Sequence, residues 1–146
     1  MAKVRITQWN AQALLDLVPQ VLQAYGEKVA PMLQEQIKAK EYYYPVPTVR
    51  KVGLYSGKFV PGRTTRDIVD TGELLKSQQA PQVSDSTLRI RWTADYSGEV
   101  LRGNYLVGTV RTSYIAPPRD WITPVLQAAP PEQFFAEEWR RLADGQ

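Results

Sequence analysis

The chain has 146 residues, of which 43% are hydrophobic and 23% charged, a length and composition that predict one globular domain with a sizeable core. It contains neither cysteine nor histidine, which excludes thiol nucleophiles, disulfide bonds, thiolate zinc sites, histidine general bases and Ser-His triads. The net charge of +3 does not by itself indicate nucleic-acid binding, and without a signal sequence or an apolar run of roughly 20 residues we expect a cytoplasmic protein with no membrane contact.

The first predicted element is a long amphipathic helix that begins at Asn10, a residue type that caps helix N-termini. Pro19 and Pro31 each remove a backbone donor, so we expect a kink or break at one or both, and two helices remain an alternative to one. The helix is predicted because apolar residues recur at three- and four-residue steps: Leu14, Val18, Val21, Leu22, Tyr25, Val29, Met32, Leu33 and Ile37.

Residues 42–70 predict a long extended loop, with an irregular hairpin as an alternative, because three prolines and three glycines between 45 and 62 suit neither a helix nor a central strand. A connection of this length indicates a function or an assembly contact. Its tyrosines and basic residues are typical of protein interfaces and also suit a phosphate backbone. We expect contact with neighbouring subunits or partner proteins through Tyr42, Tyr43, Tyr44, Arg50, Lys51, Tyr55, Lys58, Phe59, Arg63 and Arg66.

The stretch RDIVDTGELLKSQ, residues 66–78, places Asp67 and Asp70 three apart, a spacing that would also suit a metal or catalytic pair. We favour a structural interpretation, in which Asp70 caps a short helix over 72–78 and Gly72 relieves strain at the sharp turn before it. Leu74 and Leu75 then fix the short helix to the core. No other catalytic group lies nearby, so we expect no enzyme activity, cofactor or metal.

The stretch TLRIRWT, residues 87–93, alternates strictly and predicts a half-buried strand. Leu88, Ile90 and Trp92 share the face that we expect to pack against the long helix. Arg89 and Arg91 lie on the polar face, where solvation or cross-strand pairing is the first interpretation and a subunit or DNA contact the second. Residues 79–83 precede a Ser-Asp-Ser turn, so they should pair with the strand as a hairpin.

The remaining elements are short. In DYSGEVLRG, Asp95 is predicted to cap one or two helical turns that Gly103 ends, and NYLVGTVRTSYI then resumes a strand-like pattern. Pro118 and Pro131 suit helix starts. An amphipathic C-terminal helix is expected over 131–143, with one apolar stripe made by Phe135, Trp139 and Leu142. The four tryptophans are expected to be packing anchors: Trp9, Trp92, Trp121 and Trp139.

These elements predict an α+β fold for residues 1–146, with a small, mainly antiparallel sheet against a long N-terminal helix, short helices and the extended loop. Three stretches between Asp67 and Leu126 resemble, in their order and spacing, the neck and tail-completion proteins of long-tailed bacteriophages, a family often called minor tail components. The first matches at Thr71, Gly72, Leu74 and Ser77; the second at Tyr96, Val100 and Gly103; the third at Pro117, Pro118, Arg119, Trp121, Pro124 and Leu126.

The resemblance implies a structural virion protein at the head-tail junction, where an oligomeric ring joins the connector to the tail tube. Its implied partners are further copies of the chain, the neighbouring connector or stopper protein and the tail tube protein, with genomic DNA passing through the ring lumen. Adaptor, stopper, tail-terminator and tail-completion positions all remain open. The alternative function is a non-enzymatic nucleic-acid-binding module that uses the basic, aromatic loop.

Overall fold

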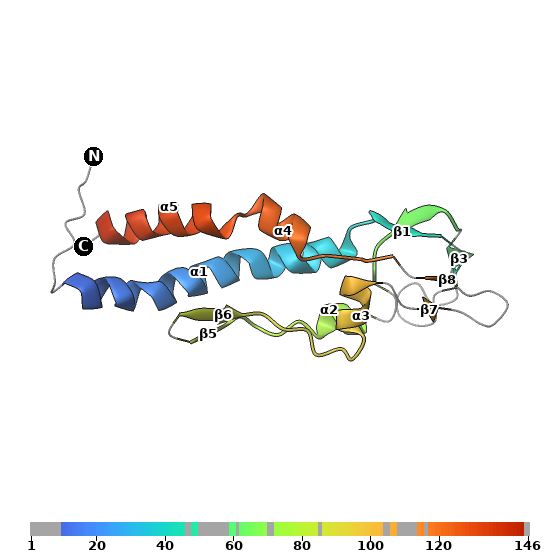
Figure 1. The fold of residues 1–146 in the computed structure, drawn as a ribbon, viewed down its shortest axis with the longest axis horizontal. Coiled ribbons are helices and arrows are strands. Elements are labelled where there is room, and N and C mark those ends of the chain that lie inside the picture. Colours follow the sequence, from blue (N-terminus) through green and yellow to red (C-terminus); the bar gives the residue numbers. More distant parts are fainter. Residues whose placement is uncertain are drawn as a thin grey trace.

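A computed structural model describes residues 10–45, 48–49, 59–60, 62–69, 72–84, 86–103, 106–107, 114–115 and 117–144. Over these ranges the chain is α+β, as predicted. Figure 1 shows an elongated molecule with α1 (Asn10–Lys38) along its middle. The helices α4 (Thr123–Ala128) and α5 (Pro131–Asp144) lie along one side of α1, and the strands β5 (Gln82–Ser84) and β6 (Thr87–Arg89) lie along the other.

The helix α1 is continuous through both prolines, so the alternative of two separate helices is wrong. Although each proline removes a donor, residues before and after it belong to the same buried stripe, and their packing holds the two halves in line. The buried residues of this stripe are Leu17, Val21, Leu22, Tyr25, Val29, Leu33 and Ile37. All of them except Leu17 were part of the predicted apolar face, and Val18 and Met32 are only partly buried.

The C-terminal helices return along α1, and α5 confirms the helix predicted from Pro131. The hydroxyl of Tyr25 donates to the carbonyl of Ala129 at 2.9 Å, which fixes the bend between α4 and α5. Burial raises the pKa of Tyr25, with the nearby Glu132 charge acting in the same direction. The Tyr25 ring lies 5.3 Å from that of Phe134 and 6.3 Å from that of Phe135. The apolar stripe of α5 therefore includes Phe134, which the predicted stripe omitted.

The hairpin of β5 and β6 confirms the predicted pairing, with Val83 opposite Leu88. Further along, Gln78 pairs with Trp92. Between this pair and the pair of Val83 with Leu88, the first arm has one residue more than the second. The extra residue lies among residues 79–81 and interrupts the pairing as a β-bulge does. As predicted, Leu88, Ile90 and Trp92 share the face towards the core, where they are partly buried.

The segment predicted as a long loop contains a β-hairpin. Its root is the pair β1 (Tyr42–Tyr44) and β4 (Thr64–Arg66), and further out β2 (Thr48–Val49) pairs with β3 (Phe59–Val60). Both ladders keep one antiparallel register, because Tyr44 faces Thr64 and Thr48 faces Val60. We call residues 42–66 the long hairpin.

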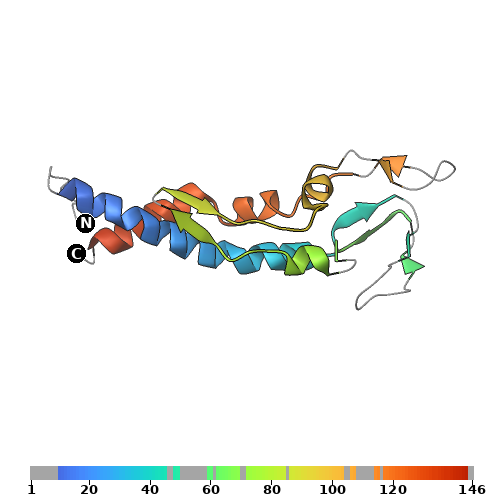
Figure 2. The same ribbon diagram turned by 90° about the horizontal axis from the view of Figure 1, so that it is seen from below.

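A second, shorter hairpin joins β7 (Leu106–Val107) to β8 (Tyr114–Ile115), and we call residues 106–115 the short hairpin. Figures 1 and 2 place both hairpins past the C-terminal end of α1, whereas the start of α1 and the end of α5 lie at the opposite end. The predicted antiparallel pairing is confirmed for the described residues, whose strands form four separate two-stranded ladders rather than one continuous sheet.

Candidate assembly interface

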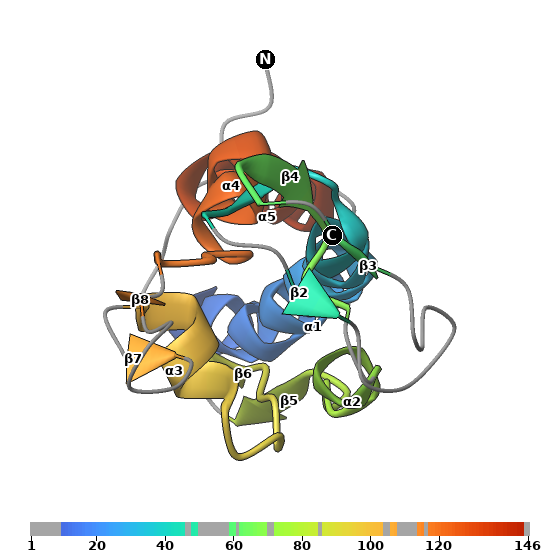
Figure 3. The ribbon, with the colours of Figure 1, turned by 90° about the vertical axis from the view of Figure 1, so that its right-hand side faces the viewer.

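Three segments meet at the base of the two hairpins, and we call them together the brace. They are α2 (Glu73–Lys76), α3 (Ser97–Arg102) and the irregular residues 117–121. Figure 3, viewed from the hairpin end, shows α2 and α3 on the side of α1 that faces away from α4. The brace contains described residues from all three stretches on which the resemblance rests, whereas Pro124 and Leu126 of the third lie in α4.

The first member of the brace begins at Gly72, which precedes α2 with φ of 80° and ψ of −4°. This left-handed conformation confirms that the turn there favours glycine. The backbone N–H of Leu74 donates to the hydroxyl of Tyr96 at 3.1 Å, which joins α2 to α3. Leu74 is buried and Leu75 partly buried, as predicted. Asp70, the predicted cap, lies outside the described residues.

The second member, α3, does not use Asp95 as its N-cap, so that prediction is wrong. The cap position is Tyr96, which makes no side-chain capping bond. A turn precedes the helix, in which the N–H of Ser97 donates to the carbonyl of Ala94 at 3.0 Å, and it leaves Asp95 exposed. Gly103 does end α3 as predicted: its N–H donates to the Glu99 carbonyl at 2.8 Å.

The third member crosses Gly103 and returns to the core. The N–H of Arg119 donates to the carbonyl of Val100 at 3.0 Å. Trp121 is only 1% exposed and packs edge-on against Trp92, with ring centroids 5.3 Å apart. Both tryptophans are therefore packing anchors as predicted, while Trp139 is partly buried and Trp9 lies outside the described residues.

The root of the long hairpin is joined to this core through Tyr42. Its side chain is only 7% exposed, and its hydroxyl lies 3.3 Å from the carbonyl oxygen of Asp120 and 3.1 Å from Nε2 of Gln36. The N–H of Ile68 also donates to the carbonyl of Ile37 at 3.2 Å. Tyr42 was predicted to be an interface residue. In the structure its side chain is buried in the core, where it fixes the point at which the hairpin leaves the molecule.

The other predicted interface residues fall into three groups. Tyr43 is 49% exposed on the hairpin surface, and Arg63 is exposed with φ of 58°. For Tyr44 in β1, Phe59 in β3 and Arg66 in β4, the structure describes the backbone but not the side chain. The remaining four lie outside the described residues: Arg50, Lys51, Tyr55 and Lys58. The interface therefore stays a prediction for all of them.

Asp120 positions the start of α4, a role that the sequence prediction assigned to Pro118. The carboxylate accepts hydrogen bonds from the N–H of Ile122 at 2.8 Å, the N–H of Thr123 at 3.0 Å and the Thr123 hydroxyl. Burial acts to raise the pKa of Asp120, but these hydrogen bonds from Thr123 and Ile122 outweigh it, so the pKa is lowered overall. Because α4 begins at Thr123, the prediction of a helix start at Pro118 is wrong.

We expect Asp120→Ala to destabilise the protein by about 0.5 to 2 kcal/mol at neutral pH, as for loss of other helix caps. Asp120→Asn should cost less, because the amide oxygen can still accept from the two backbone N–H groups. Because the pKa of Asp120 is lower in the folded state, ionised Asp120 stabilises the protein at any pH above its unfolded-state pKa of roughly 4. This contribution disappears as the pH falls through the folded-state pKa. Urea unfolding of both variants at several pH values measures the loss of stability. A difference in unfolding free energy from the parent chain that persists unchanged in acid would contradict the prediction.

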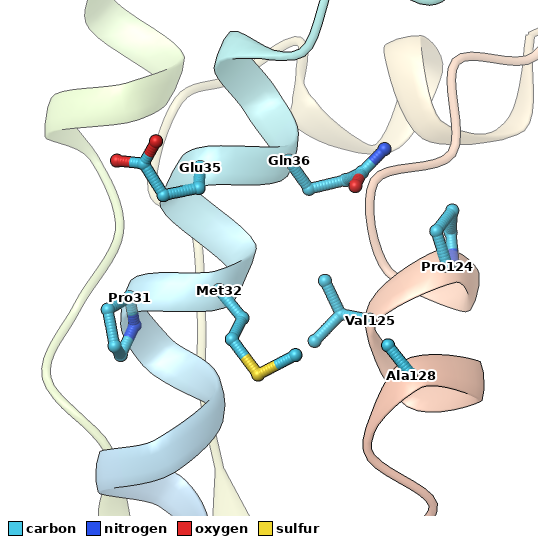
Figure 4. A pocket seen from close by; sticks show the side chains of 7 residues that line it. All are labelled: Pro31, Met32, Glu35, Gln36, Pro124, Val125 and Ala128. Carbon is cyan, nitrogen blue, oxygen red and sulfur yellow. The ribbon is translucent and has the colours of Figure 1, made fainter.

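A shallow groove of about 390 Å³ lies between α1 and α4 (Figure 4). Met32 extends across it towards Val125, and Pro124 and Ala128 line the α4 side. Gln36, at one end, also bonds to Glu41 and to the hydroxyl of Tyr42. The groove therefore offers mainly apolar contact, with no arrangement of nucleophile and base.

Asp67, the first member of the predicted acidic pair, is buried and accepts a hydrogen bond from the N–H of Val69 at 3.0 Å. Among the described residues, no three acidic side chains come together as a metal site would require. Over the same ranges, no helix combines the length and apolar character needed to span a membrane. Comparison with known proteins gives no match to a family model, to a curated protein or to a solved structure.

Proposed function

We propose that the chain is a structural protein of the bacteriophage head-tail junction, which forms an oligomeric ring and joins the connector to the tail tube. The observation that carries this proposal is the projection of two β-hairpins from one end of an elongated molecule. Such arms reach past the body of a subunit and can contact a neighbour over a large surface. The long hairpin also carries the tyrosines and arginines that are enriched in interfaces.

The brace gives the arms a fixed base, which an interface between rigid subunits requires. Tyr42 and Ile68 tie the long hairpin to the end of α1 and to residues 117–121. Gly103 and Arg119 tie the segments on either side of the short hairpin to each other. Residues that carry the resemblance to tail-completion proteins, among them Val100, Gly103 and Arg119, thus hold the base of the short hairpin. This supports a role for the arms in assembly rather than in catalysis.

The proposal is tested by disrupting the gene for this chain in its phage. We expect filled heads and finished tails to accumulate separately, and purified chain added to such an extract should restore joined particles. The matched control is the same extract with chain that has been heat-denatured. Normal particles in the absence of the chain would contradict the proposal. Strong, salt-dependent binding of the isolated chain to duplex DNA would favour the nucleic-acid-binding alternative instead.

A further inference from the structure

A second apolar groove, which we call the β6 groove, lies between β6 and α4 with α1 as its floor. Its volume is about 260 Å³. One wall is made by Leu88, Ile90 and Trp92, and the other by Ile122, Val125 and Leu126. Small-molecule sites usually occupy roughly 300 to 1,000 Å³ and contain a few convergent polar groups. The β6 groove is smaller and entirely apolar at its walls, so it suits side chains of a polypeptide better than a cofactor.

The strand that forms the first wall has an unpaired edge. Within the described ranges, β6 pairs with β5 and with no other strand. The carbonyl of Arg91 accepts from the N–H of Gln79 at 2.7 Å, and the N–H of Thr93 donates to Ser77 at 3.2 Å, both towards the first arm of the hairpin. Backbone groups of an antiparallel strand alternate between its two edges. The groups of Ile90 and Trp92 therefore face the other edge. There the carbonyl of Trp92 accepts a hydrogen bond from the Ser97 hydroxyl at 3.4 Å.

Leu88, Ile90 and Trp92 thus line the groove with their side chains, and Leu88 and Ile90 also offer unpaired backbone groups. By the same alternation the backbone groups of Leu88 also face the open edge, while the side chains of all three line the groove. Leu126, on the opposite wall, is 40% exposed. Unpaired backbone groups, here those of Leu88 and Ile90, beside apolar pockets are the arrangement that binds an extended peptide by strand addition.

Charge indicates what kind of strand fits. Arg89 and Arg91 are exposed on the outer face of this arm, and no described residue of β5 or β6 is acidic. A strand added to the edge would place alternate side chains in the groove and the others beside the two arginines. Opposite charges at such cross-strand positions are favourable and like charges are unfavourable.

We propose that the β6 groove binds an extended segment of another protein, whose apolar residues alternate with acidic ones. A second copy of this chain fits less well, because its own alternating stretches, TLRIRWT and TVRTSYI, carry arginine between the apolar residues. Those arginines would lie beside Arg89 and Arg91. The inference rests on the groove and its edge, and it holds whether or not the chain forms a ring.

Nuclear magnetic resonance on the full-length, isotope-labelled chain tests this proposal. The probe is a short synthetic peptide that alternates valine with glutamate, compared with a valine-lysine peptide and with a block-ordered peptide of the same valine and glutamate composition. With the valine-glutamate peptide, we expect hydrogen exchange to slow at the amides of Leu88, Ile90 and Trp92. The amide of Thr93, already bonded, should change little. Equal binding of all three peptides, or no slowing at alternate amides, would overturn the proposal.

Charge reversal provides the matched variants. Arg89→Glu combined with Arg91→Glu should weaken binding of the glutamate peptide about tenfold and strengthen binding of the lysine peptide. Arg102→Glu combined with Arg140→Glu makes the same change in net charge away from the groove and should leave the preference unchanged. If the unmodified chain instead dimerises and protects the same amides without peptide, the occupant is a second copy, and the proposal of a different protein is overturned.

Discussion

Replacing Gly103 with alanine should give the largest loss of stability of any single change considered for this chain. Gly103 has φ of 64° and ψ of −155°, a region that is nearly confined to glycine. An added Cβ would also lie 2.3 Å from the nitrogen of Pro118 and 2.6 Å from the carbonyl carbon of Pro117. Both neighbours are backbone atoms, so a side-chain rotation cannot relieve the contact.

The backbone strain costs roughly 1 to 3 kcal/mol and the overpacking a similar amount, against a total stability of about 5 to 15 kcal/mol. We therefore expect Gly103→Ala to lower the urea midpoint strongly or to prevent folding. Two variants calibrate the result. Gly72→Ala has the strained φ of 80° but open space, with Lys76 Cε at 3.9 Å, and should cost about 1 to 2 kcal/mol.

Gly98→Ala is the matched control, since Gly98 lies within α3 and the nearest atom to an added Cβ belongs to the flexible end of Arg102. It should be neutral or stabilising by up to about 1 kcal/mol because alanine favours helix. Circular dichroism during urea unfolding measures all three variants. A midpoint for Gly103→Ala equal to that of Gly98→Ala would show that residues 117 and 118 do not pack on α3 as described.

Shortening the long hairpin should abolish assembly while leaving the chain folded. The change replaces residues 46–62 with an Asn-Gly turn, which suits a tight two-residue hairpin. It keeps β1 and β4 in register and keeps Tyr42 in its contacts with Gln36 and Asp120. The core residues of α1, α4 and α5 are untouched, so the unfolding midpoint should change little.

Joining of heads and tails should be lost, because the removed segment holds five of the ten residues expected at the interface: Arg50, Lys51, Tyr55, Lys58 and Phe59. The control is Leu15→Ser, which removes a 62% exposed apolar side chain near the start of α1, far from the hairpins. It should leave joining unchanged. Normal joining by the shortened chain would show that the contacts between subunits use other surfaces.

The elements predicted correctly from sequence are those with a local pattern. The apolar stripe from Val21 to Ile37 specifies α1, and the alternation from Leu88 to Trp92 specifies one arm of a hairpin. Gly72 and Gly103 were recognised because a turn or a helix end needs a conformation that other residues avoid. In these cases neighbouring residues determine the structure, so the sequence pattern is enough.

The predictions that failed depend on contacts between distant segments. Tyr42, Tyr43 and Tyr44 are adjacent residues of the same type, so the sequence does not distinguish them. Only the packing of the hairpin root shows that Tyr42 is buried while Tyr43 is exposed. Asp95 and Asp120 both precede a short helix, but only Asp120 reaches the first backbone N–H groups. The pairing of β1 with β4 was left as an alternative, because prolines and glycines interrupt the alternation that marks strands.

The most direct test of the proposed function is an electron cryo-microscopy reconstruction of particles made by the phage to which the proposal assigns this chain. We predict a ring at the junction of head and tail, with the density of α1 in every subunit and both hairpins in contact with neighbouring subunits or the tail tube. A chain found elsewhere in the particle, absent from it, or present at the junction with its hairpin end free in solvent would contradict the account.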